Sequence, residues 1–182
     1  IDLEANLAFV ERELKRPADR HSQNNRPYSG GHVFPLKSQP YNNWFSGMGA
    51  FGAGRAGGRV HAASDLYTAV GRDVLAIADG AVLDYYYFYS GTYAMVVKHD
   101  DGKVVRYGEV SGALVSVGSR VSKGQRIARI GKMRCCNPML HFEMYKGTLS
   151  GQLSQPGMNK YSRRNDIMNP QYFLKDLYKS KF

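Results

Sequence analysis

The sequence predicts a mainly β domain: an antiparallel sheet folded over on itself, with an N-terminal helix and a short C-terminal helix. Three observations predict this fold. Residues 59–147 contain short segments rich in β-branched and aromatic residues, turn-forming dipeptides separate these segments, and helical spacing of apolar residues is confined to the two ends. We therefore expect an N-terminal helix and linker at 1–31, a β core at 32–150, and a C-terminal extension at 151–182 that packs on the core.

The central segments have the features of strands joined by tight turns. Asp101-Gly102 separates the runs TYAMVVKHD and KVVRYGEV, and Asp-Gly between two such runs is typical of a hairpin. Dipeptides at 79–80, 90–91 and 123–124 mark further turns. Short strands with regular turns favour antiparallel pairing.

The two ends of the chain have helical patterns. Residues 2–16 place four apolar side chains on one helical face, and Pro17 ends the run. A second, shorter helix is predicted at 170–180, opened by Asn169-Pro170.

Composition places the chain in an ordinary class. Its 182 residues are 43% hydrophobic and 22% charged, which is typical of a globular domain. No apolar stretch approaches the ~20 residues of a membrane-spanning helix, so we expect no membrane span. No secretory leader is visible, and the first residue is Ile1, so we expect a fragment of a longer protein.

The positive charge is concentrated in the last third of the chain. The net charge is +10, and residues 120–182 carry 13 basic and 3 acidic residues, so the remainder is balanced. A basic surface favours an anionic partner: nucleic acid, an anionic membrane face or an anionic cell-wall polymer. A solvated basic tail is the alternative. No nucleic-acid-binding motif accompanies the charge, so we expect no nucleic-acid partner.

The two cysteines are adjacent, at Cys135 and Cys136. This is not a disulfide framework, because adjacent cysteines close a strained eight-membered ring, and it is not the C-x₂₋₄-C spacing of a zinc site. We expect two small apolar side chains in a loop.

Two histidines and one aspartate are candidate metal ligands. His61 and Asp65 are four residues apart in an extended segment, which places both on one face. His141 alternates with Leu140 and Phe142, and we expect it to point away from that core face. Two histidines and a carboxylate form a known catalytic zinc set with an open fourth position. The spacing H-x₃-D alone is common by chance and does not establish a site.

Residues 59–145 resemble the catalytic domain of the LytM/lysostaphin-type zinc peptidases. R-V-H-A-A-S-D at 59–65 resembles the family pattern R-x-H-x-G-x-D, and M-L-H-F-E at 139–143 resembles H-x-H-F-E. The segment 117–131 matches V-x-x-G-x-x-I-x-x-x-G. The match is collinear and covers about half of the chain. It implies a lysostaphin-type fold, Zn²⁺ held by His61, Asp65 and His141, and hydrolysis of peptide bonds in peptidoglycan stem peptides or cross-links.

Two histidines of the family pattern are absent. Glu109, in Y-G-E, stands where the middle segment has a histidine, and Met139 replaces the first histidine of H-x-H. A carboxylate can accept the proton of an attacking water, so we expect Glu109 to be the catalytic base. Met139 cannot, so its role is lost or moved. The alternatives are an inactive module that binds cell wall or activates a hydrolase, and a basic nucleic-acid binder.

The pair of Y-G-E and M-L-H-F-E also resembles a branch found among type VI secretion cell-wall effectors. That resemblance implies a secreted antibacterial toxin acting in the periplasm or cell wall of a bacterial target. It also implies an immunity or inhibitor protein as a partner.

Other residues near these motifs have two interpretations each. We expect Glu143 to brace the site, Tyr107 to donate to an oxyanion or pack in the sheet, and His99 to be exposed in a turn. His32 and Asn43 are further candidates for the cleft.

Two segments are also ambiguous. The glycine-rich stretch 46–58 forms either a mobile flap over a cleft or a plain loop. The aromatic run 85–89 forms either a stacking platform or an apolar rim.

Overall fold

The computed structural model describes residues 31–153 and 164–182; the helix predicted at 2–16 lies outside them. The described residues form one nine-stranded sheet with antiparallel pairing throughout, which confirms the predicted fold class. The strands are β1 (Ser64–Tyr67), β2 (Asp73–Leu75), β3 (Gly80–Tyr89), β4 (Thr92–His99), β5 (Val104–Ser111), β6 (Arg120–Val121), β7 (Arg126–Ile130), β8 (Met139–Tyr145) and β9 (Ile167–Met168). Two short 3₁₀ turns, η2 (Gly47–Gly49) and η3 (Ala56–Gly58), precede β1, and α2 (Gln171–Lys181) follows β9.

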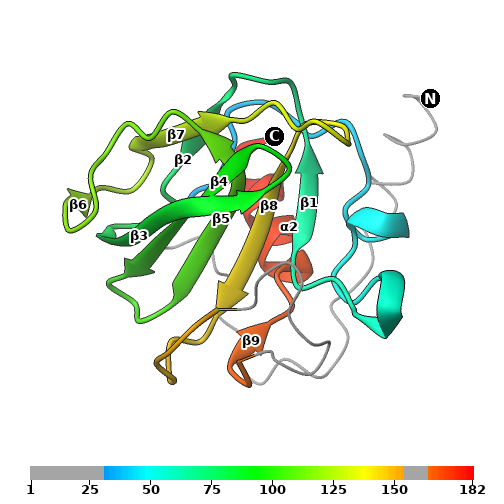
Figure 1. Cartoon of the computed structure of the whole chain (residues 1–182). Helices are drawn as coiled ribbons and strands as arrows, with labels where there is room; N and C mark the ends of the chain where they lie inside the picture. The colour runs from blue at the N-terminus through cyan, green and yellow to red at the C-terminus, as the bar shows by residue number, and fades with distance from the viewer. Residues whose placement is uncertain (1–30, 154–163) are drawn as a thin grey trace.

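The strand order shows how the sheet folds over. The main path runs β1-β8-β5-β4-β3-β6, while β7 pairs with both β5 and β2, and β9 pairs with β8. Figure 1 looks onto this sheet with α2 behind β8 and β1. No helix among the described residues has the length and apolarity needed to cross a bilayer.

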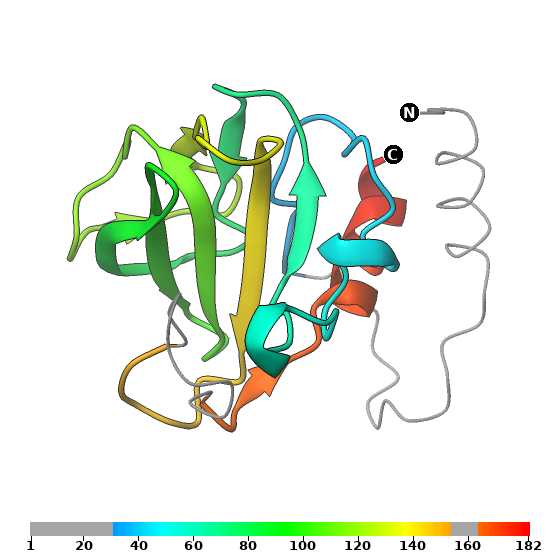
Figure 2. The same cartoon turned by 45° about the vertical axis from the view of Figure 1, so that its right-hand side comes forward.

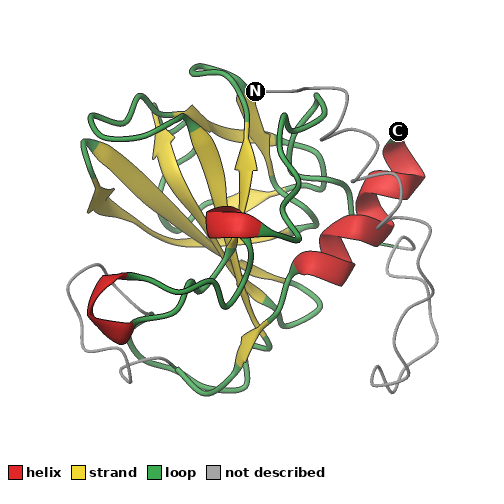
Figure 3. Ribbon diagram, turned by 90° about the vertical axis from the view of Figure 1, so that its right-hand side faces the viewer, coloured by secondary structure: helices red, strands yellow, loops and turns green. Residues whose placement is uncertain are grey.

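Helix α2 covers one face of the sheet. Its bounds agree within a residue with the predicted 170–180, and Asn169 accepts a hydrogen bond from the Gln171 N–H at 3.0 Å. Phe173 and Leu177 enter the same core cluster as Leu140 and Phe142 of β8. The helix and the sheet form two layers in Figure 2, and Figure 3 shows α2 alongside the strands.

Strand β8 is buried on both faces. The alternation of Leu140, Phe142 and Met144 toward the core is as expected, but His141 is also buried, with 9% of its surface exposed. His141 does lie on the face opposite to Leu140 and Phe142, as expected, but that face is covered and not open to solvent. The ring of Phe88 and the ring of His61 lie 5.4 Å and 5.0 Å from the ring of His141 and cover it.

The predicted exposure of His99 is also wrong. His99 is 1% exposed and lies on the same strand face as the buried Val97. Its ring nitrogens contact the Ala78 carbonyl at 3.0 Å and the Tyr107 hydroxyl at 3.1 Å. The Tyr107 hydroxyl also accepts the Ile77 N–H at 3.0 Å, so Tyr107 is a core residue.

His32 lies away from the predicted site. Its Nε2 is 2.8 Å from Asp101 in the β4–β5 turn, and its ring packs edge-on against Phe173 of α2 at 5.2 Å. These contacts join three parts of the fold.

Candidate metal centre and active site

The pairing of β1 with β8 brings the predicted ligands together. Asp65 lies directly opposite His141 in this register. His61 stands four residues before Asp65, at the end of the glycine-rich segment 46–58. The side chains of all three residues are largely buried.

The ligand atoms form a compact triangle. The Nε2 atom of His61 is 3.3 Å from Nδ1 of His141 and 3.1 Å from Oδ1 of Asp65, and Nδ1 of His141 is 3.0 Å from that oxygen. Zinc bound tetrahedrally at about 2.0–2.1 Å has ligand atoms about 3.3 Å apart. The donor set and the size of the triangle both fit one zinc ion.

The glycine-rich segment fixes the orientation of His61. The His61 Nδ1 donates to the Ala50 carbonyl at 2.9 Å, which leaves the Nε2 lone pair facing the triangle. The backbone of His61 also bonds to Gly52 and Ala53, each at 2.8 Å. This segment therefore braces a candidate ligand.

A buried carboxylate fixes the orientation of His141. The His141 Nε2 lies 3.2 Å from Glu143, so Nδ1 faces the triangle. Glu143 is fully buried and is held by Arg106 and the Tyr145 hydroxyl. Burial alone would raise the pKa of Glu143, but Arg106 and His141 lower it to about 2. Glu143 therefore has the bracing position that was expected for it.

The charge of Asp65 suits a cation site. Burial opposes ionisation, but the imidazoles of His141 and His61 beside the carboxylate hold the Asp65 pKa at about 2. The other oxygen, Oδ2, faces Arg55 at 3.8 Å.

Glu109 lies at a bulge in β5, beside the triangle. Tyr93 and Ala94 of β4 pair with Val110 and Gly108, so Glu109 is the extra residue. Its φ is 63°, in the left-handed region, and the neighbouring Gly108 lies opposite His141.

The Glu109 carboxylate is buried and partly unpaired. It is 7% exposed, and its Oε2 has no hydrogen-bond partner among the described residues. Burial raises its pKa to about 7, with the charge of Asp65 acting in the same direction and His141 and Arg55 opposing it.

Two residues of this site were not predicted, Tyr67 and Arg55. Tyr67 follows Asp65 by two residues on β1 and lies opposite Met139 in the β8 register. Burial raises the pKa of its phenol, Asp65 and Glu109 raise it further, and Arg55 opposes them. The same alternation that placed His61 and Asp65 on one face also places Tyr67 there, and it was the available signal.

Asn42, and not the predicted Asn43, contacts the strand that carries the candidate ligand Asp65. Asn43 bonds to Ser46 and to the Phe45 N–H, both within its own turn. Asn42 instead donates to the Asp65 carbonyl at 3.0 Å and accepts the Tyr67 N–H at 2.8 Å. It thus pins the strand that carries Asp65.

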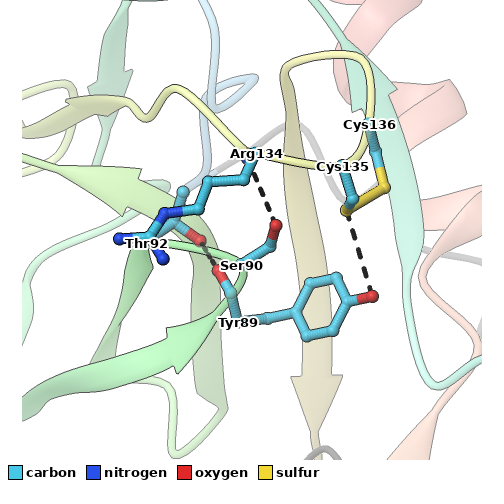
Figure 4. Close-up of a disulfide and its surroundings, with 6 residues drawn as sticks. All are labelled: Tyr89, Ser90, Thr92, Arg134, Cys135 and Cys136. Atoms are coloured by element: carbon cyan, nitrogen blue, oxygen red, sulfur yellow. Dashed lines mark hydrogen bonds between the residues drawn. A yellow bond between two sulfur atoms is a disulfide. The ribbon is translucent and has the colours of Figure 1, made fainter.

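The expectation that Cys135 and Cys136 are unbonded is wrong. They form a disulfide in the β7–β8 loop, as Figure 4 shows. The Tyr89 hydroxyl lies 3.9 Å from the Cys135 Sγ, and the Arg134 N–H donates to Ser90 across the same junction. Ring strain makes such a bond rare but does not forbid it, and the loop joins the tip of the β3–β4 hairpin to the start of β8.

The aromatic run 85–89 divides between the two faces of the sheet. Tyr85 packs against the main core and stacks on Tyr93 at 5.1 Å. Phe88 covers His141, while Tyr87 and Tyr89 are exposed. Phe88 is therefore the member of this run that contacts the candidate site.

Comparison with known proteins agrees with this geometry. The model of peptidase family M23 matches residues 59–156, which is more than half of the chain. The murein hydrolase activator EnvC of Escherichia coli (strain K12) is 39% identical over 87 residues, which are 47% of this chain and 20% of EnvC. The peptidoglycan DD-endopeptidase ShyA of Vibrio cholerae is 35% identical over 86 residues, 46% of this chain and 20% of ShyA.

The matched region spans about a fifth of the length of these two relatives. The catalytic domain of lysostaphin, an antimicrobial peptidase from Staphylococcus simulans, aligns with a TM-score of 0.52 and 26% identity, covering 71% of this chain and 90% of that one. The predicted LytM/lysostaphin-type resemblance is confirmed, and the chain belongs to peptidase family M23.

Proposed function

We propose that this chain is a zinc-dependent endopeptidase that hydrolyses peptide bonds in peptidoglycan stem peptides or cross-links. The observation that carries the proposal is the triangle of His61, Asp65 and His141 beside the buried carboxylate of Glu109. An activator that had lost catalysis would not need three ligand atoms this close together, nor hydrogen bonds to Ala50 and Glu143 that orient the two imidazoles toward them.

His61, Asp65 and His141 would hold the zinc ion. When bound there, zinc supplies a Lewis acid that polarises the scissile carbonyl and acidifies the attacking water. The hydrogen bonds to Ala50 and Glu143 keep both imidazoles in the tautomer that presents a lone pair to the ion.

Glu109 would act as the general base. Its Oε2 is unpaired among the described residues, so it can accept a proton from the attacking water and return it to the departing amine. Burial favours a protonatable carboxylate, since it raises the Glu109 pKa toward neutral pH.

The test is product analysis of digested peptidoglycan by mass spectrometry. The wild-type chain should release new amino termini, and a chelator or His61→Ala should abolish both the product and bound zinc. Glu109→Gln should bind zinc and lower the rate by roughly 10²–10⁴-fold, the usual contribution of a general base. Asp176→Asn on α2 makes the same acid-to-amide change away from the site and should retain full activity.

Loss of the product on Glu109→Gln, with zinc retained, is the result that the proposal requires. A Glu109→Gln variant as active as wild type removes Glu109 from the mechanism, and a wild-type chain that binds no zinc contradicts the proposal as a whole.

The second candidate is a non-catalytic module that binds cell wall or activates a hydrolase. Its support is the likeness to the activator EnvC and the loss of two family histidines at Glu109 and Met139. Under that function the pure chain yields no muropeptide product but increases the product of an added cell-wall hydrolase.

The setting that we propose is the periplasm or cell wall of a bacterial target, with the chain secreted as an antibacterial toxin module. An immunity protein made by the producing cell would then block the site. Expression in a periplasm, with and without candidate inhibitor genes, tests this part separately.

A further inference from the structure

A hydrogen-bond donor is missing from the candidate site where β8 begins. The family pattern H-x-H-F-E has a histidine at the position of Met139. The thioether of Met139 is at best a weak acceptor and donates nothing. The developing negative charge on the scissile carbonyl oxygen still needs a donor.

The strand register places Tyr67 at this position. Tyr67 is the cross-strand partner of Met139. Two residues earlier on β1, Asp65 is the cross-strand partner of His141, and strand alternation places both pairs on one face of the sheet. Direct partners in an antiparallel pair have Cα atoms about 4.5–5.5 Å apart. Tyr67 therefore projects from the opposing strand on the same side as the ligand triangle.

The Tyr67 hydroxyl is available. It has no hydrogen-bond partner in residues 31–153 and 164–182, whereas the hydroxyls of Tyr107 and Tyr145 are bonded inside the fold. Its side chain is only half-buried, unlike those of the three residues that precede it on β1.

The charges around the phenol are those of the candidate active site. Asp65, Glu109 and Arg55 all act on Tyr67 electrostatically. A neutral phenol in this setting donates without adding charge, which suits a residue that interacts with both a ligand carboxylate and a general base.

We propose that the Tyr67 phenol is the catalytic hydrogen-bond donor that replaces the missing histidine, binding the scissile carbonyl oxygen as it becomes negative. The inference rests on the proposed peptidase function. The phenol keeps its proton throughout, so no bond to Tyr67 forms or breaks, and proton transfer stays with Glu109.

The test removes only the hydroxyl, with Tyr67→Phe. Loss of one oxyanion donor costs about 10²–10³-fold in kcat, so we expect kcat to fall by roughly 100-fold with KM little changed. Zinc content and melting temperature should remain those of wild type. Tyr172→Phe on α2 is the matched control, because its ring is 44% exposed and distant in the fold, and it should change none of these values.

A binding measurement separates this role from a structural one. A peptide phosphinate mimics the tetrahedral transition state, whereas an uncleavable analogue of the stem peptide mimics the ground state. Tyr67→Phe should weaken phosphinate binding by about the same factor as kcat and leave ground-state binding unchanged. Equal losses for both ligands, or none for either, would overturn the inference.

Restoring the family histidine provides an independent check. Met139→His should recover at least tenfold of the lost kcat in the Tyr67→Phe background and add less than that to wild type, because both side chains serve one oxygen. Equal effects in the two backgrounds would show independent roles and contradict the inference. Thermal melting monitors folding, and the Tyr67→Phe measurements stand without this variant.

The outcomes also separate the two proposals. A wild-type chain that cleaves, with Glu109→Gln impaired and Tyr67→Phe fully active, overturns only the role of Tyr67. A zinc-loaded wild-type chain that yields no product overturns the proposed function and this inference with it.

Discussion

Glu109 adopts a backbone conformation that L residues rarely tolerate. Its φ of 63° and its unpaired buried oxygen are both unfavourable for folding. This residue of the bulge interacts electrostatically with Asp65 and His141 of the triangle. Stability is thus given up at the residue to which we assign proton transfer.

This trade-off predicts the effect of Glu109→Gly. Glycine accepts the positive φ without strain, and the change removes a buried carboxylate, so the free energy of unfolding should rise by about 1 kcal/mol. For a domain of this size the melting temperature should rise by about 2–4 °C. Calorimetry measures the stability, and peptidoglycan digestion should show no activity. A lower melting temperature would mean that Glu109 makes stabilising contacts that outweigh its strain.

At the residue scale, motif spacing was enough to predict the candidate metal ligands but not the conformation of Glu109 or the disulfide. His61, Asp65 and His141 could be found from sequence because their spacing follows strand alternation and a family pattern. The conformation of Glu109 could not, since nothing local to Y-G-E signals a left-handed residue where glycine is usual. The Cys135–Cys136 disulfide was missed because an argument from ring strain gives a frequency and not a prohibition.

The β5–β8 pair carries the support of the site. Arg106 on β5 and Glu143 on β8 are cross-strand partners, both almost fully buried, and Glu143 in turn holds His141. A buried ion pair contributes little when complete, but removing Arg106 takes the main counter-charge from the buried Glu143.

Arg106→Met should therefore lower the free energy of unfolding by about 3–5 kcal/mol. The double variant Arg106→Met/Glu143→Met should regain much of that loss, because apolar residues of similar size can replace a buried pair. Zinc affinity should stay about 10–100-fold below wild type in the double variant, since His141 has lost its carboxylate partner. Urea unfolding and competition with a chelator measure the two quantities. Full recovery of zinc affinity would show that Glu143 does not orient His141.

At the element scale, strands and turns were largely predictable. The Asp-Gly turn at 101–102 and the core face of β8 follow from local pattern, and both appear as expected. Burial of the second face of β8 was not predictable, because Phe88 and the segment 46–58 come from elsewhere in the chain. His99 lies two residues after Val97, so strand alternation places both side chains on the core face. The turn that follows His99 had suggested an exposed side chain instead.

At the scale of the whole molecule, one polar contact joins the segment before β1, the β4–β5 turn and helix α2. Asp101 bonds to His32 and to Lys103, and His32 rests on Phe173 of α2. Burial opposes ionisation of Asp101, but these hydrogen bonds hold its pKa below the usual range.

The depressed pKa of Asp101 predicts how stability depends on pH. Its contribution is fully present above the unfolded-state pKa of about 3.9 and is lost as the pH falls toward the lower folded value. Asp101→Asn should melt below wild type at pH 6, and the difference should narrow below about pH 4. Asp176→Asn is the control and should follow wild type at every pH. A constant difference between Asp101→Asn and wild type would assign the effect to packing.

The register of β1 against β8 also sets the time at which the site can exist. Asp65 and His141 are 76 residues apart, and β8 is the last strand to join the main path of the sheet. A nascent chain that has left the ribosome only as far as β7 carries two ligands and no metal centre. If the chain is the peptidase that we propose, its hydrolytic activity appears only after β8 has been synthesised, so chains that stop before β8 are harmless to the cell that makes them.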